Sequence, residues 1–301
     1  MVKRPHADRD PSRHLPTAVA CAGLVFVVLA VVILALPNPA QITREFTAGN
    51  IISDANFFNP DAMSTENVQD FLERTTCTPQ DGASCLAAYR VDTVAKPVSP
   101  GHCASMPTYR HRLASAVISQ IARACSINPE VILVLLQKEQ SLITRPSPTG
   151  YQKATGYACP DTADCDKRFF GFFNQVYAAA WQFREYTLNP TEWRYHIGQN
   201  VIQYHPKASC GSSRVTIINQ ATANLYNYTP YQPNAQTRAN PNGPAGDCSA
   251  YGNLNFWRIY KNWFGDPRTL PTIGFVIPCL SYTGGATCPT PSPFLPRTKT
   301  F

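Results

Sequence analysis

The sequence lacks several patterns that identify common classes of functional site. No Cys-x2-Cys pair occurs among its 11 cysteines, which argues against a structural metal site. No basic cluster is interleaved with aromatic residues, so we expect no binding to nucleic acid. Ser141 and Ser249 lie in no nucleophile-elbow pattern, which argues against a serine hydrolase. His196 and His205 have no acidic partner in register, and we therefore expect neither a metal nor a cofactor.

One long apolar run lies near the start of the chain. Residues 18–36 carry no charged or strongly polar side chain, and four basic residues precede them. The run is close to the ~20 residues that cross a hydrocarbon core, which favours an uncleaved anchor over a cleavable signal. We expect a basic cytoplasmic tail over residues 1–16, a single transmembrane helix over residues 17–37 and an extracytoplasmic remainder. Cleavage near Ala40 would instead give a secreted protein.

Ten cysteines follow the apolar run, and an even number beyond a targeting segment predicts a disulfide framework. Three local pairs would each close a loop rich in Pro, Gly, Asp or Ser: Cys77 with Cys85, Cys159 with Cys165, and Cys279 with Cys288. By elimination Cys103 would pair with Cys125 and Cys210 with Cys248, although sequence alone leaves the connectivity open. With all ten paired, no thiol remains in the exported part for a cysteine peptidase.

The charge balance indicates the kind of surface that the exported part would meet. After residue 40 the chain has 22 basic and 17 acidic residues, a net charge of +5. This mild excess suits an anionic cell wall or lipid surface.

The spacing of apolar residues predicts a mainly α-helical fold with a small β element. Ser64 or Thr65 would cap a short helix reaching Leu72, and an amphipathic helix should cover residues 109–124. Capped by Ser126 or Asn128, the next helix is nearly all apolar from Val131 to Leu136, so it should be central and buried. Further helical patterns cover residues 176–186, 217–228 and 256–264, and the mixed pattern of residues 193–216 leaves room for short strands.

The chain beyond the apolar run should have three parts. We expect an N-terminal extracytoplasmic segment over residues 41–107, ending in a linker or surface loop rich in Pro and Gly over residues 91–107. The helical domain would span residues 108–267. Residues 268–301 would form a Pro-rich, disulfide-closed tail.

Glu139 is the candidate for acid–base chemistry. The residues at helical spacing from it, namely Ile132, Leu135, Leu136, Leu142 and Ile143, place its carboxyl group on a largely apolar stripe. Removal from water favours the protonated form of a carboxylic acid, which is the form that a general acid requires. On spacing alone, however, an ordinary helix carboxylate paired with a basic residue such as Arg145 is the better interpretation.

Two segments of the chain resemble known glycan-cleaving proteins. Residues 127–141, Ile-Asn-Pro-Glu-Val-Ile-Leu-Val-Leu-Leu-Gln-Lys-Glu-Gln-Ser, resemble the helix that carries the catalytic Glu of lytic transglycosylases and goose-type lysozymes. The segment Gly171-Phe-Phe-Asn-Gln175 is similar to the Gly-Leu-Met-Gln segment that lines the sugar groove of that superfamily. The span 50–265, with its Ile-Ile-Ser-Asp-Ala-Asn-Phe-Phe opening, also looks like a group of actinobacterial secreted proteins. These resemblances imply a lysozyme-like domain.

The resemblance also implies roles for individual residues. Glu139 would be the general acid and then the general base in cleavage of the β-1,4 glycan of peptidoglycan. Gln175 would hold the sugar by hydrogen bonds, and a tyrosine would support the acid or the cationic centre, with Tyr204, Tyr226 and Tyr228 as candidates. The full set of candidate substrate contacts is Gln140, Asn174, Gln175, Tyr204, Tyr228 and Trp193.

Two positions depart from the superfamily pattern. Gln140 replaces the usual serine after the acid, and Tyr177 stands where goose-type enzymes tend to place an aspartate. A single carboxylate favours the transglycosylase route, in which the substrate's own group attacks. Hydrolysis would need a second carboxylate, for which Asp161, Asp164 and Asp166 are candidates, although such loop residues usually cap turns. Two alternatives to an enzyme stay open: a catalytically inactive wall-binding or adhesion protein on the same fold, and a scaffold for growth machinery.

Overall fold

The computed structural model describes residues 45–160, 163–244 and 246–269. These residues belong to one compact unit that begins at Thr43. The predicted membrane segment over residues 17–37, the basic tail before it and the predicted Cys279–Cys288 pair lie outside the described residues. Within the described ranges, no helix is both long enough and apolar enough to cross a membrane.

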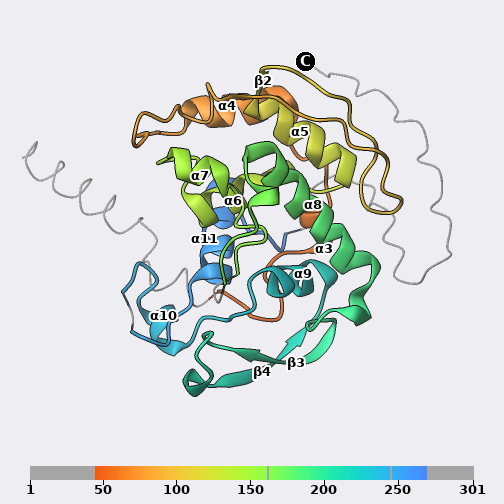
Figure 1. The fold of residues 1–301 in the computed structure, drawn as a ribbon. Coiled ribbons are helices and arrows are strands. Elements are labelled where there is room, and N and C mark those ends of the chain that lie inside the picture. Colours follow the sequence, from red (N-terminus) through yellow and green to blue (C-terminus); the bar gives the residue numbers. More distant parts are fainter. Residues whose placement is uncertain (1–44, 161–162, 245, 270–301) are drawn as a thin grey trace, which may run out of the picture. The chain divides into compact units, whose positions relative to one another are not determined.

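The described residues are mainly helical with a small β element, as the sequence predicts (Figure 1). In chain order the α-helices are α3 (Asp54–Phe57), α4 (Thr65–Arg74), α5 (Ala114–Cys125), α6 (Pro129–Gln140), α7 (Pro148–Gln152), α8 (Phe172–Leu188), α9 (Gln220–Tyr228), α10 (Ala235–Ala239) and α11 (Gly252–Phe264). Two antiparallel pairs complete the fold, β1 (Arg90–Val91) with β2 (Arg112–Leu113) and β3 (Gly198–Gln203) with β4 (Ser212–Ile217).

Helix α6 is the buried centre of the fold. Its N-cap is Asn128, whose Oδ1 accepts a hydrogen bond from the Glu130 amide (2.7 Å). Every residue from Val131 to Leu136 is at most 4% exposed, and α5 and α11 pack against the helix. The prediction of a central, buried helix is confirmed. The helix ends where Ser141 adopts a left-handed conformation (φ 53°), which places Glu139 in its last turn.

Helix α8 begins earlier than the sequence pattern predicts. Phe172 and Phe173 are both buried, so the core extends the helix back to Gly171, which is its N-cap at φ 98°. The predicted start at Val176 was therefore four residues too late. As a result, Gln175 lies inside the first turns of a helix and faces the protein interior, where it is 0% exposed.

The N-terminal segment is part of the same core. Phe57 packs edge-on against Phe183 of α8, with ring centroids 5.1 Å apart. The Ile51 amide donates a hydrogen bond to Oγ1 of Thr222 in α9 (2.9 Å), and the Ser53 amide donates to the carbonyl oxygen of Pro267 (3.1 Å). The boundary expected near residue 107 therefore falls within one compact unit.

Four of the five predicted disulfides lie within the described residues, and all four are present. They join Cys77 to Cys85, Cys103 to Cys125, Cys159 to Cys165 and Cys210 to Cys248. The Cys103–Cys125 bond ties the loop expected over residues 91–107 to the end of α5. That loop is further ordered by backbone pairing of Lys96 with Met106.

Candidate functional site

Glu139 holds a partly shielded carboxylate at the end of α6. Its side chain is 23% exposed, and Oε1 accepts a hydrogen bond from Nζ of the neighbouring Lys138. The Lys138 side chain is only 6% exposed, and its ammonium also donates to Oγ1 of Thr229, at the end of α9 (2.8 Å). Glu139 thus lies neither in bulk water nor sealed in the core. Its basic partner is Lys138, whereas Arg145 is exposed.

A glycine turn approaches the other carboxylate oxygen of Glu139. Gly156 has φ +69°, and a Cβ added there would lie 3.1 Å from Oε2 of Glu139. A left-handed conformation is costly for residues with a side chain, and the space above the carboxylate leaves little room for one. The carboxyl group is therefore bracketed by the Lys138 ammonium on one side and by the backbone of this turn on the other.

The side chain of Gln175 holds the turn that carries Gly156 through hydrogen bonds. Its Oε1 accepts hydrogen bonds from the amides of Thr155 (3.3 Å) and Tyr157 (3.1 Å), on either side of Gly156. Its Nε2 donates to the carbonyl oxygens of Tyr157 (3.0 Å) and Phe169 (3.0 Å). The Gln175 side chain is fully buried and hydrogen-bonded at both ends, so its contacts are with the turn that approaches Glu139.

Tyr228 is the candidate tyrosine that lies beside the acid. Its hydroxyl donates a hydrogen bond to the carbonyl oxygen of Thr155 (2.8 Å), and its ring packs on Phe183 (centroids 4.9 Å apart). Burial, and then the negative charge of Glu139, hold the pKa of Tyr228 well above its ordinary value. Tyr228 therefore stays a neutral hydrogen-bond donor at any ordinary pH.

The other candidate residues lie at various distances from this centre. Gln140 directly follows Glu139, and Asn174 adjoins Gln175 on α8, with its Nδ2 donating to the Phe170 carbonyl oxygen (3.1 Å). Trp193 packs edge-on against Tyr186 (4.6 Å), and Tyr226 is buried against Tyr195 (5.8 Å).

Tyr204 lies in a different place. It lines a pocket beside β4, and Glu139 is not among the residues that line that pocket. The structure thus brings Tyr228 and the Gln175-held turn to the acid, and it assigns Tyr204 to another surface.

The acidic loop beyond Gly156 is closed by the Cys159–Cys165 disulfide. Asp166 caps a short 3-10 helix (Lys167–Phe169) and binds the Arg168 guanidinium, with Oδ2 to Nη2 at 2.5 Å. These hydrogen bonds lower the pKa of the Asp166 carboxyl group. Asp166 therefore has the turn-capping role that loop aspartates usually have. Asp161 lies outside the described residues, and Asp164 is exposed.

Sequence reasoning missed Lys138, Gly156 and Thr229. Adjacent helix positions point in directions about 100° apart, so helical spacing does not pair Lys138 with Glu139, and the contact depends on the last turn and on α9. In the sequence Gly156 is one of several small or polar residues of a loop, and its neighbours do not indicate a contact with Glu139. Within the part of the chain that the structure describes, no three His, Cys, Asp or Glu side chains gather as a metal site would require.

Comparison with known families gives a match that includes the candidate site. Residues 50–276 match the family described as LasA, N-terminal domain, and so include Lys138, Glu139, Gly156, Gln175 and Tyr228. The chain belongs to the LasA N-terminal domain family. The match to this domain runs from the turn before α3 to beyond α11, which is three quarters of the chain. No curated protein and no solved structure matches the chain.

Proposed function

We propose that this protein cleaves the glycan strand of peptidoglycan outside the cytoplasmic membrane, with Glu139 as the acid and base. The observation that carries the proposal is the position of this carboxyl group. It stands at the end of the buried central helix α6, 23% exposed, under a glycine turn and beside the neutral hydroxyl of Tyr228. A lysozyme-like domain needs a carboxyl group of this kind, shielded from water yet within reach of a saccharide oxygen.

Three further observations support action on the cell wall. The chain belongs to the LasA N-terminal domain family, and this membership indicates an extracellular protein that acts on the cell wall. The disulfides are typical of proteins that fold in an oxidising compartment outside the cytoplasm. The net positive charge beyond residue 40 suits an anionic wall. In this proposal, residues 17–37 anchor the protein in the membrane, or are removed to release it.

One carboxyl group can serve both halves of the reaction. Protonated Glu139 would donate its proton to the glycosidic oxygen as the bond from that oxygen to the anomeric carbon breaks. The resulting carboxylate would then take the proton of a substrate hydroxyl as that oxygen attacks the same carbon, which restores the acid and gives an anhydro sugar. The Lys138 ammonium would stabilise the carboxylate between these two steps.

The neighbouring side chains would hold the saccharide. Gln140, Asn174 and Trp193 are proposed as direct contacts, and Tyr228 as a donor close to the reacting centre. Gln175 is proposed as a positioning residue, because its amide is committed to the turn that carries Gly156.

A second candidate function is favoured by the Lys138–Glu139 ion pair. The Lys138 ammonium is bound to the one carboxyl group that the enzyme proposal depends on, and a wall-binding protein with a silent groove would need no proton donor. Binding without cleavage is the outcome that this second function predicts.

One variant separates the two functions. Glu139→Gln keeps the shape of the side chain but cannot donate or accept the proton, and Glu66→Gln, at an exposed position in the first turn of α4, is the matched control. Purified full-length proteins are incubated with sacculi, and both co-sedimentation and released muropeptides are measured. The enzyme predicts release by the unmodified protein and by Glu66→Gln but not by Glu139→Gln. Co-sedimentation with no release from any form would end the enzyme proposal in favour of wall binding.

A further inference from the structure

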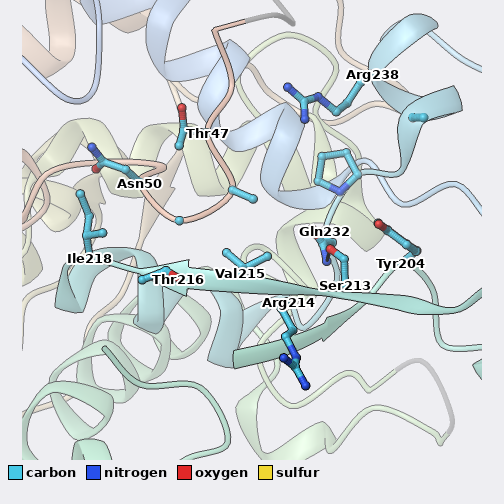
Figure 2. Close-up of a pocket in the computed structure, with 14 residues that line it drawn as sticks. Thr47, Asn50, Tyr204, Ser213, Arg214, Val215, Thr216, Ile218, Gln232 and Arg238 are labelled. Atoms are coloured by element: carbon cyan, nitrogen blue, oxygen red, sulfur yellow. Dashed lines mark hydrogen bonds between the residues drawn. The ribbon is translucent and has the colours of Figure 1, made fainter. Parts of the chain in front are cut away.

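A second surface, separate from Glu139, has the properties of a binding site. A pocket of about 600 Å³ lies between β4, the turn over residues 47–50 and helix α10 (Figure 2). This volume is within the range of small-ligand sites, roughly 300–1,000 Å³. Its wall includes Tyr204, for which sequence reasoning proposed a sugar contact beside Glu139. Tyr204 therefore belongs to a surface separate from Glu139.

One wall of the pocket is the edge of a strand. The Tyr204 amide donates a hydrogen bond to the Gly211 carbonyl oxygen (3.1 Å), directly beyond the last ladder pair, Gln203 with Ser212, so these two residues continue the β3–β4 register as a hydrogen-bonded pair. Such pairs alternate along an antiparallel ladder. The backbone N–H and C=O groups of Arg214 and Thr216 therefore point away from β3, toward the free edge of β4.

The turn at Gly49 covers only part of that edge. The Ile218 amide donates to the Gly49 carbonyl oxygen (3.0 Å), and Gly49 approaches the Thr216 carbonyl so closely that an added Cβ would lie 2.0 Å from its oxygen. Arg214 is the next residue that faces outward. No described segment pairs with its backbone at this edge, so its N–H and C=O are available to an added strand.

The charge in the pocket comes from Arg238. Figure 2 shows its side chain reaching from α10 over the pocket, whereas the Arg214 side chain points away on the other side of β4. One Nη of Arg238 donates to the Phe46 carbonyl oxygen (3.2 Å), which holds the guanidinium in place. Arg238 forms none of the ion pairs found in the described ranges, and no described residue that lines the pocket is acidic.

We propose that this pocket binds the free carboxyl terminus of an extended peptide. The peptide backbone would add to β4 at Arg214, and its terminal carboxylate would pair with the Arg238 guanidinium. An open strand edge recognises a peptide backbone, whereas an isolated phosphate or a sugar would leave it unused. The source of the peptide rests on the proposed function: a protein that acts on peptidoglycan would meet its peptide stems, which end in a carboxylate.

The test measures binding of a synthetic stem pentapeptide that ends in a free carboxylate, beside the same peptide ending in an amide. Titrations by calorimetry use the full-length protein. The proposal predicts that amidation weakens binding at least about tenfold, as expected when a charged hydrogen-bond partner is lost. Equal binding of acid and amide, or no binding of either, would overturn it.

Arginine variants localise the binding. Arg238→Gln removes the cation over the pocket and should weaken binding of the acid at least about tenfold. Arg74→Gln, at an exposed position of α4 that does not line the pocket, is the matched control and should change binding less than about twofold. Arg238→Lys keeps the charge and should retain part of the affinity, which guards against a folding defect in Arg238→Gln. An equal loss in Arg74→Gln and Arg238→Gln would refute the assignment, as would inorganic phosphate displacing the peptide at equal concentration.

The Glu139→Gln variant keeps this inference apart from the proposed function. Because the pocket does not include Glu139, that variant should bind the peptide acid as the unmodified protein does. Peptide binding without muropeptide release would leave the pocket assignment standing while the catalytic proposal fails. Muropeptide release without peptide binding would support the catalytic proposal and refute the pocket assignment.

Discussion

We propose Gln175 as a positioning residue, and Gln175→Leu tests this role directly. The substitution nearly keeps the volume of a side chain that is 0% exposed, but it removes the acceptor of two amides, those of Thr155 and Tyr157. Leaving a buried donor without a partner costs about 1–3 kcal/mol each. We therefore expect the free energy of unfolding to fall by about 2–6 kcal/mol, a large part of the ~5–15 kcal/mol of a typical protein.

Thermal and urea unfolding of the full-length protein measure this loss. For a unit of this size 1 kcal/mol corresponds to roughly 2–4 °C, so the midpoint should fall by about 4–24 °C. Asn174→Ala is the matched control on the same helix, because that side chain makes one hydrogen bond at a half-buried position and should cost only about 1 kcal/mol. Unchanged stability of Gln175→Leu, with only weaker affinity for glycan, would show that Gln175 is a direct sugar contact and that our reasoning is wrong.

Three further predictions concern other parts of the fold. Gly49→Ala should lower the free energy of unfolding by several kcal/mol, because the new Cβ would overlap the Thr216 carbonyl group. Gly82→Ala is the control: its Cβ would meet nothing within 4 Å, so it should cost only the ~1–2 kcal/mol of a left-handed backbone. Chemical unfolding of the two variants measures the difference. Lys138→Met should lower the free energy of unfolding by roughly 1–3 kcal/mol, because it leaves the partly shielded Glu139 carboxylate without its ion-pair partner. Adding Glu139→Gln to this variant should restore part of the lost stability. If the losses of the two single variants simply add in the double variant, the two side chains are not coupled and the prediction is wrong.

Burial raises the pKa of several tyrosines above 10, including Tyr151, Tyr186, Tyr226 and Tyr228. In this range the unfolded chain binds fewer protons than the folded chain, so stability should fall as the pH rises above 10. The tyrosinate absorbance of these four residues should then appear together with unfolding, after that of the more exposed tyrosines. Ionisation of all 14 tyrosines in a protein that is still folded would contradict the burial of these hydroxyls.

Local sequence features predicted the scaffold well. Asn128 followed by Pro129 marks the start of α6, the all-apolar run that follows marks its central place, and the short spacings between cysteines indicated the local disulfides. These features depend on neighbours in the sequence, which is why they can be read without a structure. The start of α8 was missed because Phe172 and Phe173 join the helix through tertiary packing.

The candidate site was predicted only in part. Glu139 became the candidate because the segment around it resembles the catalytic helix of lytic transglycosylases, whereas its spacing alone favoured an ordinary helix carboxylate. Tyr228 lies beside it. The Lys138 partner, the Gly156 turn and the separate location of Tyr204 depend on how α9, the loop after α7 and β3 come together, and no periodicity in the sequence reports those contacts.

The most direct test of the central claim is mass spectrometry of the glycan released from purified sacculi by the full-length protein. A single acid and base at position 139 predicts muropeptides with anhydro ends, and none when Glu139 is replaced by Gln. Release that persists in the Glu139→Gln protein, or no release from either protein, would contradict the account.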